Sequence, residues 1–242
     1  MIIIIMFGAA IAMFASIMFI EHRTSRIILT TVCGLLFAGA TLVMTLNYSQ
    51  HFGMHQVTTT TRKTIYSASN SAMPLALYQP VGTSGRDDVY IYNVQTRQKT
   101  PNHTQANEFT TSKIKWTNRA TPELVTTETR WRYNNRFFAA LYRWSGMDGT
   151  LVKRTNTLEY PRTYVKLTVK QADQLKKQAQ TPAAKQAQAV ARQQGKTAVA
   201  SAVQAALAKN PHLSAQQIQQ VSQRAEQRFQ GQLVRQMLKN QQ

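Results

Sequence analysis

The stretch FIEHRTSRII, residues 19–28, separates two long apolar runs. Neither residues 1–20 nor residues 27–46 contain a charged side chain. A helix rises about 1.5 Å per residue, so each run can cross the roughly 30 Å hydrocarbon core of a bilayer. A soluble protein would need a large apolar domain around both runs, yet the rest of the chain is polar and basic. The sequence therefore predicts a transmembrane helical hairpin over residues 1–46, with spans 1–20 and 27–46.

The short polar loop between the spans predicts the direction of insertion. Arg23 and Arg26 are the only Lys or Arg residues before Arg62. Arginines in a short loop stay on the cytoplasmic side, whereas long domains translocate largely regardless of their charge. Arg23 and Arg26 are thus the expected topology determinants of a two-span cell-membrane protein. Its N-terminus and its C-terminal domain are expected to be extracytoplasmic.

A cleaved leader is the alternative to a retained hairpin. The first run lacks the basic segment with which a signal peptide begins. A second candidate begins at His22-Arg23 and ends at Ala38-Gly39-Ala40, which resembles an A-x-A cleavage site. Two retained spans are the simpler interpretation. The only cysteine, Cys33, lies in the second span, so the chain has no intramolecular disulfide.

Residues 47–169 are rich in β-branched and aromatic side chains between turn formers, which predicts a β-rich extracytoplasmic domain. Turns are expected at Asn134-Asn135 and between Gly146 and Gly149, and residues 74–85 are expected to form a loop. The absence of helical crossovers favours a small antiparallel sandwich or barrel. The candidate strands are 57–67, 89–96, 111–117, 124–133, 137–144, 151–159 and 164–169.

Residues 170–242 are rich in Gln, Ala and Lys and predict a basic tail that is helical or partly disordered. Thr168 with Gln171 resembles a capping box that starts a helix ending near Gln180. Pro182 is placed to begin the next helix, and Gly195 is a candidate end of that helix. A second box precedes a last helix with one apolar stripe. The box is Ser214 with Gln217, and the stripe is Ile218, Val221, Ala225, Phe229 and Leu233. The fold class is therefore a membrane-anchored α+β protein.

The sequence offers no constellation typical of catalysis. His51 and His55 have the spacing of helical metal ligands, but the stretch HFGMH lacks the Glu of a zinc-protease helix. Asp87-Asp88 is more typical of a turn than of a calcium loop. Glu123, Glu128 and Glu159 are expected to pair with neighbouring arginines. No catalytic, cofactor-binding or metal-binding residue is predicted, no cofactor is expected, and the sequence leans towards a protein that is not an enzyme.

Positive charge is the strongest remaining signal. Only two of the 29 Lys and Arg residues and one of the ten Asp and Glu residues precede residue 47. The rest of the chain thus carries 27 basic and nine acidic residues, which favours a polyanionic partner. In residues 130–144 arginines alternate with aromatics. This pattern fits a basic and aromatic face that stacks on a ligand, but it is more typical of aromatics pointing inward and arginines outward. The candidate polyanion contacts are Arg130, Arg132, Arg136, Arg143, Lys176, Lys177, Arg224 and Arg228.

Three features together resemble a known family. They are the two spans with a short basic loop, the stretch RWRYNNRFFAALYRW (130–144) and the stretch LVKRTNTLEYPRTYVKLTVKQADQLKK (151–177). The chain is similar over residues 1–180 to an uncharacterised family of small membrane proteins from lactic-acid bacteria. The resemblance implies the anchored architecture and a Gram-positive envelope. It carries over no catalytic residue, because the domain of that family has no known function.

The leading hypothesis is a non-enzymatic envelope binding or scaffold module whose basic outer region contacts anionic wall polymer or lipid. The first alternative is an accessory subunit of a membrane transporter or wall-synthesis complex, recognised through helix faces lined by small residues. The second alternative is a hydrolase or transferase acting on envelope polymer. The expected partners are the lipid bilayer and either anionic wall polymer or a membrane protein, and nucleic acid is not expected outside the cell. The small residues are Gly8, Ala12, Ser16, Gly34 and Ala38.

Overall fold

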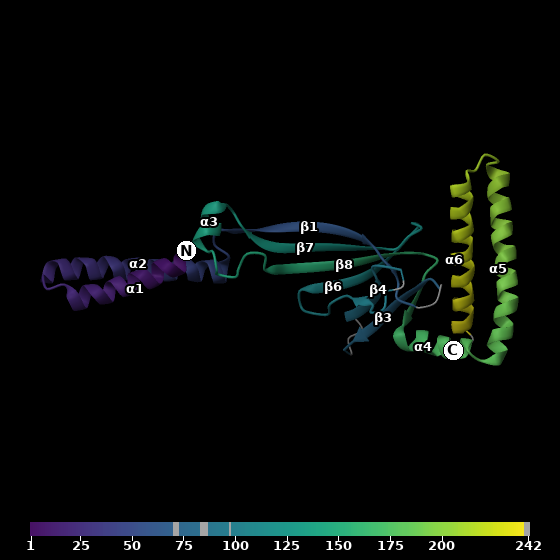
Figure 1. Ribbon diagram of the computed structural model, residues 1–242, viewed down its shortest axis with the longest axis horizontal. Coiled ribbons are helices and arrows are strands. Elements are labelled where there is room, and N and C mark those ends of the chain that lie inside the picture. Colours follow the sequence, from purple (N-terminus) through teal and green to yellow (C-terminus); the bar gives the residue numbers. More distant parts are fainter. Residues whose placement is uncertain (70–72, 83–86, 97, 240–242) are drawn as a thin grey trace. The chain divides into compact units, whose positions relative to one another are not determined.

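The fold is that of a computed structural model, which describes residues 1–69, 73–82, 87–96 and 98–239 (Figure 1). The chain forms two compact units. The first comprises Met1–Thr59 and Glu128–Arg154, and the second comprises Thr60–Thr127 and Thr155–Gln242. The boundaries between the units lie at residues 59/60, 127/128 and 154/155. Each falls within a long strand, so these strands contribute residues to both units.

The first unit contains the N-terminal helical hairpin of α1 (Ile2–Phe19) and α2 (Arg23–Gln50). Both helices are long and apolar enough to span a membrane. The buried residues of each helix are seven apart: Ile2, Ala9 and Ser16 in α1, and Cys33, Ala40 and Asn47 in α2. A seven-residue period is typical of two helices packed along a coiled-coil seam.

The small residues predicted to bring the helices together do not all lie on this seam. Ser16 does, and its hydroxyl lies 3.0 Å from that of Thr30. A Cβ at Gly34 would meet the Met13 sulfur at an ordinary 3.8 Å, and a Cβ at Gly8 would meet nothing within 4 Å. The helix–helix contact therefore follows the seven-residue period of the buried side chains, and the predicted four-residue spacing of small residues does not define it.

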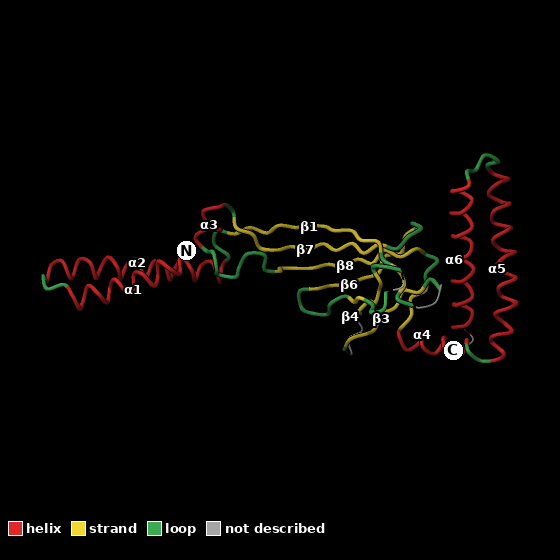
Figure 2. The backbone as a smooth tube through the Cα atoms, viewed as in Figure 1, coloured by secondary structure: helices red, strands yellow, loops and turns green. Residues whose placement is uncertain are grey.

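The strands form two sheets (Figure 2). The four-stranded sheet has the order β1-β7-β8-β6, and the other sheet has the order β2-β4-β3-β9 with β5 paired to β4. Strands β3 and β4 pair antiparallel, whereas β3 and β9 pair parallel. The four-stranded sheet contains β1 (Met54–Thr64), β6 (Thr110–Thr117), β7 (Glu123–Tyr133) and β8 (Leu151–Pro161). The other contains β2 (Tyr66–Ser67), β3 (Leu75–Val81), β4 (Asp87–Asn93), β5 (Asn102–His103) and β9 (Val165–Thr168).

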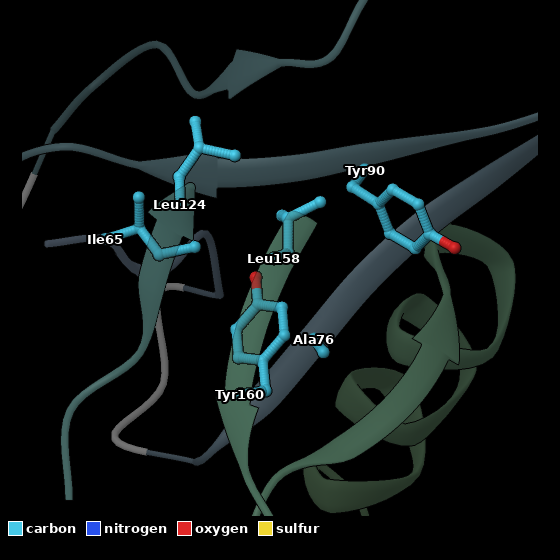
Figure 3. Packing of buried hydrophobic residues seen from close by; sticks show 6 residues of the cluster. All are labelled: Ile65, Ala76, Tyr90, Leu124, Leu158 and Tyr160. Atoms are coloured by element: carbon cyan, nitrogen blue, oxygen red, sulfur yellow. The ribbon is translucent and has the colours of Figure 1, made fainter. Parts of the chain in front are cut away.

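The main core of the second unit joins the two sheets. Its side chains come from β3 and β4 of one sheet, from β7 and β8 of the other, and from Ile65 between β1 and β2 (Figure 3). Leu158 and Tyr160 are completely buried. Two sheets that share one apolar core form a sandwich, which confirms the β-rich fold class. The cluster consists of Ile65, Ala76, Tyr90, Leu124, Leu158 and Tyr160.

Three helices follow the last strand: α4 (Val169–Ala179), α5 (Pro182–Lys209) and α6 (Ala215–Lys239). The capping box of Thr168 and Gln171 is present, and Pro182 begins α5, as predicted. Ser214 and Gln217 exchange the hydrogen bonds of the second predicted box. Leu175 of α4 and Val234 of α6 are buried against β3 and β9. The C-terminal helices α4 and α6 thus complete a second apolar core.

The prediction that Gly195 ends a helix is wrong, because α5 continues through it. A Cβ at Gly195 would lie 3.1 Å from the ring of Phe229 on α6. The glycine therefore allows α5 and α6 to approach each other closely.

The predicted strand 137–144 is also wrong, because this stretch begins with a short helix, α3 (Arg136–Leu141). Asn135 has extended backbone and its side chain accepts a hydrogen bond from the Phe138 N–H, so it caps α3. The expected left-handed turn at Asn134-Asn135 is therefore absent from this described stretch. The predicted turn between Gly146 and Gly149 is confirmed, since both have positive φ.

The predicted loop over 74–85 contains strand β3 instead. Burial of Leu75, Ala76 and Leu77 outweighs the turn signal of Pro80, which pairs with Asp88 near the end of the strand. Asp88 accordingly belongs to β4 and not to a turn. Gly85 lies outside the described residues. The parallel pairing of β3 with β9 differs from the all-antiparallel sandwich that we predicted.

The contact between Gly231 of α6 and the loop before β9 gives a stability prediction. A Cβ at Gly231 would clash with the Thr163 carbonyl oxygen, which is backbone and cannot rotate away. We expect Gly231→Ala to lower the free energy of unfolding by about 1–2 kcal/mol, the cost of overpacking less the gain in helix propensity. Urea unfolding of the full-length protein in detergent, followed by tryptophan fluorescence, measures this.

Gly195→Ala is the matched control, because the nearest atoms there belong to a side chain that can shift. We expect its effect to stay within about 0.5 kcal/mol, since the gain in helix propensity offsets the crowding. Equal effects of the two substitutions would contradict the packing of α6 described above.

Candidate polyanion-binding surface

Two of the predicted polyanion contacts lie on β7 and are already paired with carboxylates. The Arg130 Nε lies 2.8 Å from Glu128, and Arg130 also donates to the Gly149 carbonyl oxygen. Arg132 lies 3.0 Å from Asp148. Their charges are therefore partly neutralised within the first unit.

Six of the predicted contacts are exposed and form no ion pair with the described carboxylates. In the first unit, Arg136 begins the short helix α3 and Arg143 follows it. Lys176 and Lys177 lie in the last turn of α4, where cations also stabilise the negative end of a helix. Arg224 and Arg228 lie four residues apart on α6 and so share one face. The structure distributes these six cations between the two units.

The two arginines predicted to determine the topology lie where the hairpin turns. Arg23 begins α2 and is exposed, and the Arg26 carbonyl oxygen accepts a hydrogen bond from the Ser16 hydroxyl at 3.3 Å. The two arginines thus stay at the end of the hairpin that carries the connecting loop.

The carboxylates predicted to pair with arginines do so. Glu159 is buried on β8 and contacts Lys115 at 3.0 Å, Arg119 at 3.3 Å and Arg62 at 3.8 Å. The hydrogen bond from Lys115 lowers the pKa of Glu159 although burial opposes it. Glu128 bonds to both Arg130 and Arg154, and the hydrogen bond from Arg130 is the main cause of its lowered pKa.

One charged cluster escaped the sequence analysis. The Lys166 ammonium lies 2.8 Å from Asp88 and 4.0 Å from the centre of the Tyr78 ring. Burial alone would lower the pKa of Lys166, but the hydrogen bond to Asp88 and nearby charges raise it. Lys166 therefore stays protonated and joins β9 to β4. No sequence signal pointed to this cluster, because strand β3, which brings the two together, was not predicted.

The two histidines with helical spacing do not converge. The His51 ring stacks on Trp131 with 4.0 Å between ring centres, and His55 lies 2.9 Å from the Asn134 side-chain oxygen. Among the residues that the structure describes, no three His, Cys, Asp or Glu side chains are placed to hold a metal ion.

An open groove lies beside β3, β4 and β5, and most of its described lining is apolar or amide in character. It includes Val81, Val89, Ile91 and Pro101. His103 is the only titratable side chain in the lining that the structure describes.

The chain combines two N-terminal helices that are apolar enough to span a membrane, a β-rich sandwich and exposed cations. The chain belongs to the family described as Domain of unknown function (DUF4811), whose model matches residues 22–175. The match thus runs from the loop before α2 to the buried Leu175 of α4. No curated protein and no solved structure matches the chain.

Glu159 provides a test of the ion-pair cluster by pH. Its lowered pKa stabilises the fold above the ordinary glutamate pKa of about 4.3, and this contribution is lost as pH falls through the lower folded-state pKa. We expect Glu159→Gln to reduce the free energy of unfolding at pH 7 by about 1 kcal/mol, since the partners are largely exposed. Urea unfolding at pH 7 and pH 3 measures the difference, which should shrink at pH 3.

Glu108→Gln serves as the control, because Glu108 is exposed and forms no ion pair with the described residues. Its effect should be near zero at both pH values. A Glu159→Gln effect that is the same at pH 3 as at pH 7 would show that the charge of Glu159 does not contribute.

Proposed function

We propose that this protein is a non-enzymatic envelope module that holds a basic β-rich domain and its helices at the outer face of the cell membrane. In this proposal the hairpin spans the membrane and Arg23 and Arg26 face the cytoplasm. The basic side chains of the outer region bind a phosphodiester polyanion. The resemblance to membrane proteins of lactic-acid bacteria supports a Gram-positive envelope as the setting.

The observation that carries the proposal is the difference between paired and unpaired cations. Lys176, Lys177, Arg224 and Arg228 are exposed and have no ion pair with described carboxylates. An exposed cation without a carboxylate partner breaks no ion pair when it binds phosphate. Five of the carboxylates that the structure describes, by contrast, lie in ion pairs: Asp88, Glu123, Glu128, Asp148 and Glu159.

Wall polymers and lipid headgroups share the same phosphodiester chemistry, so the test has two arms. Full-length protein is placed in nanodiscs of zwitterionic lipid and titrated with poly(glycerol phosphate) at about 0.15 M salt, where the Debye length is about 8 Å. In the second arm, anionic vesicles containing phosphatidylglycerol replace the polymer. Binding in either arm that weakens as salt rises supports the proposal and distinguishes the two sources.

Matched pairs of substitutions test which cations bind. We expect Arg224→Gln with Arg228→Gln to weaken binding about fivefold, because two exposed cations contribute on the order of 0.5 kcal/mol each. Arg130→Gln with Arg132→Gln removes the same charge, but from residues already paired with Glu128 and Asp148. This control pair should weaken binding less than twofold, as judged by the dissociation constants.

Two results would reject the proposal. One is no binding in either arm. The other is an equal loss from both pairs of substitutions, which would mean that only net charge matters and that the exposed cations form no binding surface.

A further inference from the structure

Residues 136–144, which we call the α3 segment, connect β7 to the turn before β8 and pack against the helical hairpin. Tyr142 is 1% exposed and shares a buried cluster with Ile2 of α1 and Ala40 of α2. Phe138 and Leu141 pack against the same cluster. Figure 1 shows α3 beside the end of the hairpin that carries the N-terminus. One side of the α3 segment is thus fixed to both apolar helices.

The contacts place the α3 segment at the ends of the two apolar runs. The Tyr142 hydroxyl donates a hydrogen bond of 3.3 Å to the Val43 carbonyl oxygen. Val43 lies three residues, or about 4.5 Å along the helix, before Leu46, where the apolar run of α2 ends. Ile2 is the first residue of α1. In a bilayer spanned by the hairpin, this level is the boundary between hydrocarbon and headgroups.

The other side of the α3 segment is exposed, large and apolar. Phe137 is 67% exposed and Trp144 is 63% exposed. Trp144 has φ of 83°, in the left-handed region that favours glycine and is an outlier for a bulky side chain. The backbone is therefore held in a strained conformation at a tryptophan that contacts little of the protein, which is typical of a residue kept for function.

Two cations accompany these aromatic side chains. The Arg143 guanidinium lies 5.8 Å from the centre of the Trp144 ring, and Arg136 precedes Phe137. Neither arginine forms an ion pair with the carboxylates that the structure describes. Tryptophan is enriched at the membrane–water interface, and long basic side chains near it extend their charges to the headgroups.

We propose that the α3 segment lies in the interfacial layer of the membrane, with Phe137 and Trp144 inserted among the lipids. Arg136 and Arg143 contact the phosphates of phospholipid headgroups in the same leaflet. The occupant of this surface is bilayer lipid and not a protein, because the surface continues from the helices that span the bilayer. The inference rests on the part of the proposed function that places the hairpin in the membrane, and it does not depend on polymer binding.

Depth-dependent quenching of a single tryptophan tests the inference. Full-length protein with Trp116→Phe and Trp131→Phe retains only Trp144 and is reconstituted in vesicles of phosphatidylcholine and phosphatidylglycerol. Lipids brominated near the headgroup or near the end of the acyl chain quench tryptophans at different depths. We expect Trp144 to be quenched at least twofold more by the shallow bromine than by the deep one.

A second variant reports on the hairpin independently. Ile11 lies near the middle of α1 and is 67% exposed, so Ile11→Trp in a background with all three native tryptophans replaced by Phe reports the bilayer centre. We expect the deep bromine to quench it more strongly. If Ile11→Trp is quenched and Trp144 is not, the interfacial placement is wrong while the spanning hairpin stands. If neither is quenched, both are wrong.

A double substitution tests the role of the two arginines. Arg136→Gln with Arg143→Gln, in the background that retains only Trp144, should reduce the shallow quenching of Trp144 about twofold, because the headgroup contacts that hold the exposed side of the segment among the lipids are lost. These exposed side chains are outside the buried cluster, so the substitutions should leave the fold intact, as circular dichroism would confirm. Unchanged quenching would overturn the assignment of the arginines to lipid phosphates.

Discussion

The packing of Tyr142 against the N-terminal hairpin is the contact on which the first unit depends. Its ring stacks on Phe138 with 6.1 Å between ring centres and on Tyr133 with 5.8 Å, and its hydroxyl bonds to the backbone of α2. Tyr133 ends β7, so this one side chain links the apolar helices to a strand. The β7–β8 connection is consequently held at the apolar ends of α1 and α2.

Local signals predicted the elements whose cause is local. Runs without charged residues predicted the two apolar helices. The capping boxes at Thr168 and Ser214 predicted the starts of α4 and α6, and two glycines predicted the turn before β8. The failures have distant causes. The aromatic residues after Asn135 have the pattern of a strand, but they pack as a helix because their partners include Ile2 and Ala40, which lie far earlier in the chain. Strand β3 contains Pro80, and it exists because Leu75 and Leu77 are buried in a cluster that includes Val234.

The basic character of the candidate surface was visible in the composition, but the division into paired and unpaired cations was not. Glu159 meets Lys115 only because β8 lies beside β6, and no local pattern encodes that register. The family match also divides the unpaired cations into two groups. Arg136 and Arg143 lie within residues 22–175, whereas Arg224 and Arg228 lie beyond them. The α3 segment therefore belongs to the matched part of the chain, and the α6 cations belong to the additional helices.

The direction of insertion is the central claim, because it decides whether the basic region meets envelope polymer or the contents of the cell. Single cysteines at Ser25, Thr61 and Ser201, all exposed, are introduced in a Cys33→Ser background. Intact cells are then treated with a membrane-impermeant maleimide, and permeabilised cells give the total labelling. Our account predicts labelling at residues 61 and 201 of intact cells and none at residue 25. Labelling at residue 25 alone would contradict it and would place the basic region in the cytoplasm.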